Sequence, residues 1–303
     1  MEKFDLGLSF VWEYDVDFIA LIEEAFQKAG LSTFLISYYN ISEITNKIIN
    51  KELSFNFYFD RASDVEEEFE KIGKVLNRRK AVIFNPYDKV QHAIDKASMH
   101  LEFITAGLNV PHSIIIPPHS EREEIYISID DLAILGRPFI IKPCNTTGGG
   151  VGVVTGAESL KEVLDERVTN INDKYILQEK IYPSFFDGKR AWFRSFWAFG
   201  EVVPVWWDDQ THLYSELTPD EISRYNLKKI AGITKKIAEI TGLDFFSTEI
   251  VYTNNNKFLI IDYVNDQCDM RLSSKHIDGV PESVVNRIIN SMLKRVFKLK
   301  KLQ

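Results

Sequence analysis

The residues best placed to do chemistry are one lysine and the glycine run that follows it. Lys142 ends an apolar segment, and residues 145–152 read Asn-Thr-Thr-Gly-Gly-Gly-Val-Gly. The backbone N–H groups of such a loop can close over phosphate oxygens, and a lysine beside them favours a nucleoside triphosphate site. A P-loop carries its lysine after the glycines, and a dinucleotide fingerprint reads Gly-x-Gly-x-x-Gly, so neither motif fits. We predict a strand, a flap and a second strand over residues 151–155; a surface hairpin is the alternative interpretation.

Two acidic residues near the C-terminal end form a second candidate group. Glu249 and Asp262 lie in apolar, β-branched segments joined by a turn at residues 254–256, which places them nearly opposite each other in a hairpin. Two carboxylates about 4 Å apart repel by roughly 4 kcal/mol at an effective dielectric near 20, so a cation or a shared proton is expected, and an apo hairpin should be strained. Mg²⁺ prefers oxygen ligands, and Asn265 can add a neutral one. The alternative is that the two acids face solvent and never meet.

Composition excludes several classes of protein. The chain has 303 residues, 45% of them hydrophobic, and a net charge of -8, which argues against a nucleic-acid partner. It contains no apolar stretch of membrane-spanning length and no signal peptide, so we expect a cytoplasmic location and no membrane partner. Cys144 and Cys268 are too few for a disulfide framework, but Cys144 lies close enough to Lys142 that we expect it to be sensitive to alkylation.

Strands and helices alternate in the first part of the chain. Apolar patterns predict strands at residues 4–10, 31–37, 55–59 and 81–85, with helices at 18–29 and 64–79 between them. Such alternation predicts a small parallel-sheet domain, which we place at residues 1–93. Because it has no phosphate-binding glycine loop, we assign it substrate binding.

The rest of the chain must position the lysine and the acids. A helix at residues 94–106 and a strand at 175–178 flank the flap, and we place this second unit at residues 94–178. This second unit also contains a predicted helix at residues 159–168. A third unit, residues 179–303, contains two predicted hairpins, at 191–206 and 247–264, and helices at 220–241 and 281–299. The acids lie on the second hairpin.

Taken in order, these motifs resemble the ATP-grasp superfamily. They are Asp95-Lys96, residues 107–111 (Gly-Leu-Asn-Val-Pro), Lys142 with its flap, residues 178–181 (Gln-Glu-Lys-Ile), and Glu249, Asp262 and Asn265. The N-terminal pattern at residues 55–61 and 82–86 is similar to the glutathione synthetase and ribosomal-protein glutamate ligase (RimK-like) branch. The resemblance covers nearly the whole chain and implies an α/β ATP-grasp fold behind an N-terminal parallel-sheet domain.

The resemblance also implies roles for individual residues. Lys96 and Lys142 would contact the phosphates of ATP, with Lys142 also near the adenine, and Glu249, Asp262 and Asn265 would hold Mg²⁺. Arg194 and Arg271 would supply positive charge to the phosphate or substrate. The remaining ATP-binding positions are the lid residues Thr147, Gly148, Gly149, Gly150 and Val151 and the hinge residues Gln178, Glu179, Lys180 and Ile181.

The chain also departs from the family pattern. The family reads Glu-x-Asn where this chain has Asp262-Tyr263-Val264-Asn265, and a β-bulge could absorb the extra residue. Otherwise Asp266 or Asp269 would replace Asn265. Many carboxylate ligases carry an arginine two residues before the first metal-binding acid, and here that residue is Ser247. The aromatic residues Trp192, Trp197, Trp206, Trp207 and Tyr214 are expected to be half in the core and half in an acceptor pocket.

The function implied is an ATP- and Mg²⁺-dependent carboxylate–amine ligase that works through an acyl phosphate and releases ADP and phosphate. The partners would be a small-molecule carboxylate and an amine, with amino acids or peptides among the candidates, and a homodimer is left open. One alternative is a kinase on the same scaffold that phosphorylates a small-molecule hydroxyl. Another is an ATP-binding module without turnover, similar to synapsin.

Overall fold

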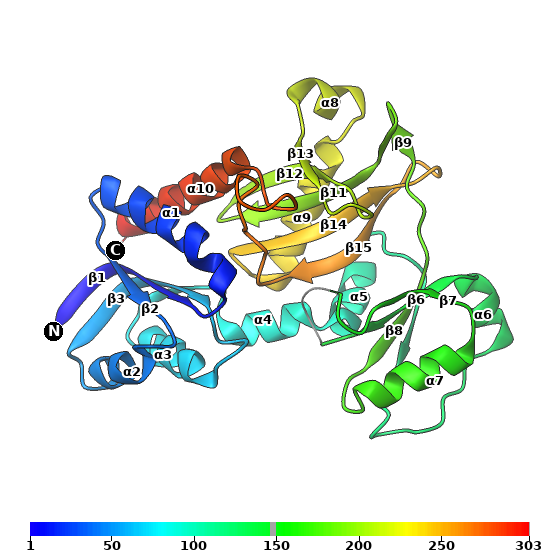
Figure 1. Ribbon diagram of the computed structural model, residues 1–303, viewed down its shortest axis with the longest axis horizontal. Coiled ribbons are helices and arrows are strands. Elements are labelled where there is room, and N and C mark those ends of the chain that lie inside the picture. Colours follow the sequence, from blue (N-terminus) through cyan, green and yellow to red (C-terminus); the bar gives the residue numbers. More distant parts are fainter. Residues whose placement is uncertain (146–149, 303) are drawn as a thin grey trace.

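The computed structural model describes residues 1–145 and 150–302 of the chain (Figure 1). Within these residues the fold is built on three larger sheets of four, four and five strands, with helices packed against them. The N-terminal sheet is parallel and the other two are antiparallel, so the predicted α/β class with a parallel N-terminal sheet is confirmed.

The N-terminal sheet has the strand order β2-β1-β3-β4. Its strands are β1 (Glu2–Phe10), β2 (Thr33–Ile36), β3 (Leu53–Arg61) and β4 (Val82–Phe84). The short helix η1 (Glu13–Asp15) and the helices α1 (Val16–Lys28), α2 (Ile41–Ile49) and α3 (Glu67–Arg78) connect them. Apolar side chains fill both faces of this sheet, with α1 on one side and α2 and α3 on the other, as expected for parallel strands.

The last helix of the chain returns to this N-terminal sheet. Helix α10 (Glu282–Lys300) packs beside α1 in Figure 1, and Val285, Ile288 and Met292 share one buried cluster with Phe18 and Ile22. The same cluster continues through Phe199 and Phe245 into the five-stranded sheet. This one cluster contains residues from before position 93 and from after position 178. The division of the chain at residues 93 and 178 therefore stays a prediction.

The second sheet carries Lys142 and has the order β5-β8-β6-β7. Its strands are β5 (Ser113–Ile116), β6 (Phe139–Pro143), β7 (Val154–Ala157) and β8 (Tyr175–Glu179). Helices α4 (Tyr87–Ile94) and α5 (Lys96–Thr105) lead into it, and α6 (Ile129–Leu135) and α7 (Leu160–Thr169) lie within its connections. Lys142 follows Ile140 and Ile141 near the end of β6, and its side chain reaches the backbone of Ile261 in the third sheet.

The third sheet carries both candidate acids and has the order β13-β12-β11-β14-β15. Its strands are β11 (Trp192–Ala198), β12 (Glu201–Trp207), β13 (Tyr214–Glu216), β14 (Phe245–Tyr252) and β15 (Phe258–Asn265). A two-stranded ribbon of β9 (Phe185–Phe186) and β10 (Lys189–Arg190) precedes it, and α8 (Pro219–Arg224) and α9 (Lys228–Thr241) lie between β13 and β14. Helix α9 packs on β11 and β12.

Several predicted elements need correction. The single helix predicted at residues 220–241 is two helices, because the chain turns at residues 225–227 and Asn226 adopts a left-handed φ of 54°. The helix predicted at 94–106 begins at Lys96, where the side chain of Asp95 caps it by accepting from Ala97 N and Ser98 N. The strand after the flap runs from Val154 to Ala157 rather than over residues 151–155.

Among the described residues, no helix combines the length and the apolar character needed to cross a membrane.

Candidate functional site

Three charged side chains lie in a row across neighbouring strands of the third sheet. Arg194 on β11 pairs with Glu249 on β14, and Glu249 pairs with Asp262 on β15. Residues directly opposite each other on antiparallel strands project from the same face with Cβ atoms about 5 Å apart. The two acids are therefore on one face of the sheet, and an arginine stands beside them (the adjacent strands β11, β14 and β15 of Figure 1).

Aromatic residues hold the Arg194–Glu249 pair in place. Arg194 forms a salt bridge to Glu249 Oε1, donates to Tyr214 Oη at 2.9 Å, and stacks over the Trp207 ring at 4.1 Å. Trp192 Nε1 donates to Glu249 Oε2 at 3.0 Å. Burial disfavours the charged guanidinium, but Glu249 and Tyr214 together outweigh it and raise the pKa of Arg194. Trp192, Trp207 and Tyr214 lie around this pair, whereas Trp197 and Trp206 pack in the core, and the acceptor pocket expected of half of these aromatic residues stays a prediction.

Lys142 reaches the same region from the second sheet. It is buried, and its Nζ donates to Gln178 Oε1 at 3.1 Å and to the backbone oxygen of Ile261 at 3.1 Å. Ile261 immediately precedes Asp262, so the lysine joins β6 and β8 to β15. Burial lowers the pKa of Lys142, while Asp262 and Glu249 act in the opposite direction. A lysine has three donors, and its acceptors among the described residues use two of them, which leaves one for another group, such as a ligand oxygen.

Asn265 lies beside Asp262 despite the extra residue in the sequence. Ser247 pairs with Asn265 and Glu249 with Asp262, so two steps along β14 match three along β15, with a register shift between the two pairs. That irregularity brings Asn265 Nδ2 within 2.7 Å of Asp262 Oδ2, to which it donates. Burial would raise the pKa of Asp262, but Lys142, Lys96 and Asn265 together hold it below its usual value.

The donor set fits a magnesium ion that substrate phosphates help to hold. Glu249, Asp262 and Asn265 offer only oxygen ligands, the type that Mg²⁺ prefers, and one or two carboxylates suffice when phosphates complete the shell. In the described part of the chain, no group of three or more His, Cys, Asp or Glu side chains is arranged to hold a metal by itself. Arg194 and Lys142 compensate the two carboxylates, so the strain expected of an apo hairpin is relieved by the protein's own cations.

The lid is only partly described. Thr147, Gly148 and Gly149 lie outside the described residues. Gly150 and Gly152 both have a φ of 71°, a left-handed conformation that favours glycine, and Val153 N donates to Gly150 O at 3.1 Å, which closes a turn. Val151 is exposed between them. The described end of the segment is therefore a tight turn before β7.

Two residues of the predicted hinge have clear surroundings: Glu179 is hydrogen-bonded to His112, and Ile181 lies near the two acids. Glu179 N donates to His112 O at 2.9 Å and its Oε1 accepts from His112 N at 2.8 Å, so the side chain is not a free surface acid. Ile181 packs with Ile261 and Trp207 beside the row of charges. Lys180 lies near the Tyr182 ring, with Nζ 6.0 Å from its centroid.

Lys96 stands close to the phosphate-binding candidates. As the first residue of α5, it donates its backbone N–H to Cys144 O at 3.1 Å. Its positive charge acts on both Lys142 and Asp262. The helix start therefore adds to the positive potential at the end of β6.

Three expectations about neighbouring residues need correction or sharper limits. Arg271 is bound locally, with Nη2 2.7 Å from Asp269 Oδ2 and 2.8 Å from Asp278 Oδ2, and its described partners do not include Glu249 or Asp262. Asp266 is bound to Asn85, which donates to its Oδ1 at 2.6 Å. Cys144 is fully buried, and burial raises the pKa of its thiol to about 12. The expectation that Cys144 is sensitive to alkylation is therefore wrong.

Two residues beside Lys142 were missed. His100 Nδ1 lies 2.6 Å from Tyr263 Oη, and Gln178 Nε2 lies 3.3 Å from the same oxygen. Tyr263 occupies the extra position between Asp262 and Asn265, which is a signal that the sequence did contain. His100 has no comparable signal, because a histidine inside a helix is common and its partner is 163 residues away.

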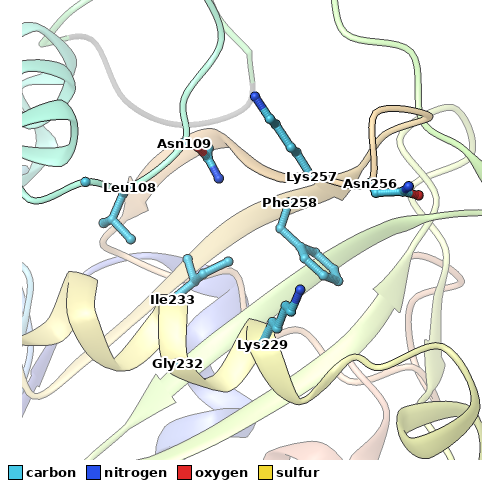
Figure 2. A pocket seen from close by; sticks show the side chains of 9 residues that line it. Leu108, Asn109, Lys229, Gly232, Ile233, Asn256, Lys257 and Phe258 are labelled. Carbon is cyan, nitrogen blue, oxygen red and sulfur yellow. The ribbon is translucent and has the colours of Figure 1, made fainter.

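A separate open pocket of about 440 Å³ lies between helix α9, the start of β15 and residues 107–109 (Figure 2). It is lined by Leu108, Asn109, Lys229, Ile233 and Phe258, among others, and none of its lining residues is a candidate phosphate- or metal-binding residue. Its lysines are exposed.

No protein-family model matches the sequence, and the comparison with curated proteins gave no match. Comparison with solved structures did find similar chains. The D-alanine–D-alanine ligase of Bacillus anthracis, complexed with ATP, superimposes with a TM-score of 0.68 at 12% identity and covers 99% of both chains. An ATP-grasp RimK domain protein from Sphaerobacter thermophilus gives 0.62 at 16% identity, covering 95% of this chain and 99% of its own.

A third solved structure is that of the ATP-grasp ligase PsnB in complex with its precursor peptide PsnA2 and AMPPNP. Its TM-score is 0.60 at 12% identity, and the match covers 95% of this chain and 98% of PsnB. Identities this low show a shared fold. The likeness extends over nearly the full length of each chain.

Proposed function

Because the chain has the ATP-grasp fold, we propose that it is an ATP-dependent ligase that joins a carboxylate to an amine. Two of the similar solved chains are ligases by name: the D-alanine–D-alanine ligase and the ATP-grasp ligase PsnB, which was solved in complex with a precursor peptide. Amino acids and peptides are therefore the substrate classes we propose for the carboxylate and the amine.

The single observation that carries this proposal is the charged row with Lys142 at its end. Arg194, Glu249 and Asp262 are in cross-strand register, and Lys142 is bound to the residue before Asp262. Alternating positive and negative groups on one face can hold a polyphosphate and neutralise a transferring phosphoryl group. A purely structural ion-pair network would not need a buried lysine with a donor left over.

We propose that each group has one task. Lys142 and Lys96 bind the nucleotide phosphates, and Arg194 stabilises negative charge on the transferred phosphoryl group or the acid substrate. Ile181 offers backbone groups to the base. Glu249, Asp262 and Asn265 would hold Mg²⁺, which when bound neutralises phosphate charge and orients the phosphates. The substrate carboxylate then attacks the γ-phosphorus, the bond to the bridging oxygen breaks and ADP leaves; the amine next attacks the carbonyl carbon of the acyl phosphate, displaces phosphate and loses a proton.

A small-molecule kinase is the second candidate, because the same charges would serve phosphoryl transfer to a hydroxyl. We propose a screen of amino acids, short peptides and small carboxylic acids with MgATP, scored for both ADP and inorganic phosphate. A ligase releases the two in equal amounts only when acid and amine are both present. ADP without phosphate would favour the kinase, and neither product with any substrate pair would favour a binding module.

A further inference from the structure

A chain of buried polar side chains runs from Lys142 away from the charged row. Its members are Gln178 on β8, Tyr263 on β15 and His100 on α5, and the exposed fractions of the three are 1%, 2% and 4%. These elements meet where the second and third sheets approach each other (Figure 1). Four polar side chains from four elements are costly to bury unless each finds a partner.

The directions of the first two hydrogen bonds in this chain follow from Lys142. A lysine can only donate, so Gln178 Oε1 accepts from Lys142 at 3.1 Å, and the amide Nε2 of Gln178 must face Tyr263 Oη at 3.3 Å. The Tyr263 oxygen accepts that bond, and its own O–H is left to donate. We assign His100 Nδ1, 2.6 Å away, as the acceptor of this O–H, which places the imidazole proton on Nε2; burial lowers the pKa of His100 and so favours the neutral ring.

Packing fixes the ring in the middle of the chain. Tyr263 stacks on His100 with centroids 5.9 Å apart and meets Phe103 edge-on at 5.3 Å. The hydroxyl therefore has one position, and Gln178 can satisfy it only with its amide nitrogen.

We propose that His100, Tyr263 and Gln178 are positioning residues that aim the Lys142 ammonium at the bound nucleotide. Gln178 holds one N–H of the lysine and Ile261 O holds another, so the direction of the third is set by the protein. If the Gln178 amide is free to rotate, it can present its NH₂ group to the lysine, and two donors then face each other. The Tyr263 hydroxyl prevents that rotation, and His100 fixes the hydroxyl. This inference rests on the proposed ATP site.

A double-mutant cycle on nucleotide binding tests the inference. The probe is ADP with Mg²⁺, measured by calorimetry on the full chain. Tyr263→Phe keeps the ring and removes the hydroxyl, and we expect ADP to bind about three- to tenfold more weakly. In a Lys142→Met background the same substitution should cost less than about twofold, because no ammonium is left to aim.

Phe103→Leu is the matched control, since Phe103 contacts the same ring but has no polar link to Lys142. Its effect on ADP binding should be the same in both backgrounds.

His100→Asn, whose side-chain oxygen can replace Nδ1 as acceptor, should bind ADP nearly as wild type does, whereas His100→Leu should resemble Tyr263→Phe. If Tyr263→Phe does not fold, the comparison of His100→Asn with His100→Leu tests the positioning role instead.

Two results would overturn the inference and can be told apart. Equal losses for Tyr263→Phe in the wild-type and Lys142→Met backgrounds would show that the tyrosine acts on stability alone, while leaving the ATP site intact. A folded wild-type chain that binds no ADP would overturn the proposed function, and the positioning role with it.

Discussion

At the scale of single residues, the buried charges of the candidate site are stable because charges of opposite sign lie beside them. Lys142 and Asp262 lie close together in a region where burial opposes the charge of each. Each therefore stabilises the other, and removing either charge leaves a partner that is poorly solvated. This differs from the expectation that two neighbouring acids alone would strain the hairpin.

Lys142→Met should weaken ATP binding by about 10- to 100-fold, because a hydrogen bond to a charged group contributes about 1.5 to 3 kcal/mol. Calorimetry on the folded variant measures this. Lys257→Met is the matched control: Lys257 is an exposed lysine of the pocket in Figure 2, and its loss should leave ATP affinity unchanged. Unchanged affinity in folded Lys142→Met would remove the lysine from the nucleotide site.

Asp262→Asn should lower turnover by at least about a hundredfold, because it removes one of two carboxylates proposed to bind Mg²⁺. The same change should also lower the free energy of unfolding by about 1 to 2 kcal/mol, since Lys142 loses a neutralising partner. Turnover across a Mg²⁺ titration and a melting curve of the apo protein measure the two effects. A higher melting temperature than wild type would mean that repulsion between the acids outweighs their attraction to the lysine.

At the scale of elements, local patterns predicted the strands better than the helix boundaries. The hairpin of β14 and β15 follows from two β-branched runs around an Asn-rich turn, and the register of Glu249 with Asp262 follows from that turn. The sequence pattern predicts one helix where the structure has α8 and α9, because the apolar spacing continues through the turn at residues 225–227. The capping box of Thr218 and Glu221 marks where α8 begins, but no strong signal marks where it ends.

Helix α8 should lose its attachment at acid pH. Burial acts to raise the pKa of Glu221, but hydrogen bonds from Thr218, Lys189 and Trp206 lower it to about 2. A depressed carboxyl pKa gives stability that is present above the unfolded value near 4.5 and is lost as pH falls toward about 2.

Wild type should therefore be more stable than Glu221→Gln at pH 6, and the difference should shrink steadily between about pH 4.5 and pH 2. Denaturant unfolding at several pH values measures the difference. Glu239→Gln, on the exposed face of α9, is the control and should show a much smaller pH-dependent difference. A difference between wild type and Glu221→Gln that does not change with pH would contradict the assignment.

At the scale of the whole molecule, contacts between distant segments could not be predicted from the sequence. Asn85, just after β4, has a left-handed φ of 52° and is buried at 2% exposure. Its side chain donates to Phe245 O and Asp266 Oδ1 and accepts from the backbone N–H groups of Asp244 and Phe245. The partners are about 160 to 180 positions away, beyond the reach of any local pattern.

Asn85→Ala should lower the free energy of unfolding by about 3 kcal/mol, because it leaves buried donors and acceptors unpaired on both sides of the contact. Denaturant unfolding measures the loss. Asn50→Ala, at the exposed end of α2, is the matched control and should change stability by less than about 0.5 kcal/mol. Equal effects of the two substitutions would show that Asn85 does not join the N-terminal sheet to β14.

The central claim is that a substrate carboxylate receives the γ-phosphoryl group. The most direct test supplies MgATP, an amine mixture and a pool of ¹⁸O-carboxylate amino acids and short peptides, and then measures the oxygen isotopes of the released phosphate. We expect phosphate that carries one ¹⁸O atom from the carboxylate, formed by wild type and not by Asp262→Asn. Phosphate free of ¹⁸O, or a phosphoryl group retained on a substrate hydroxyl, would contradict the account.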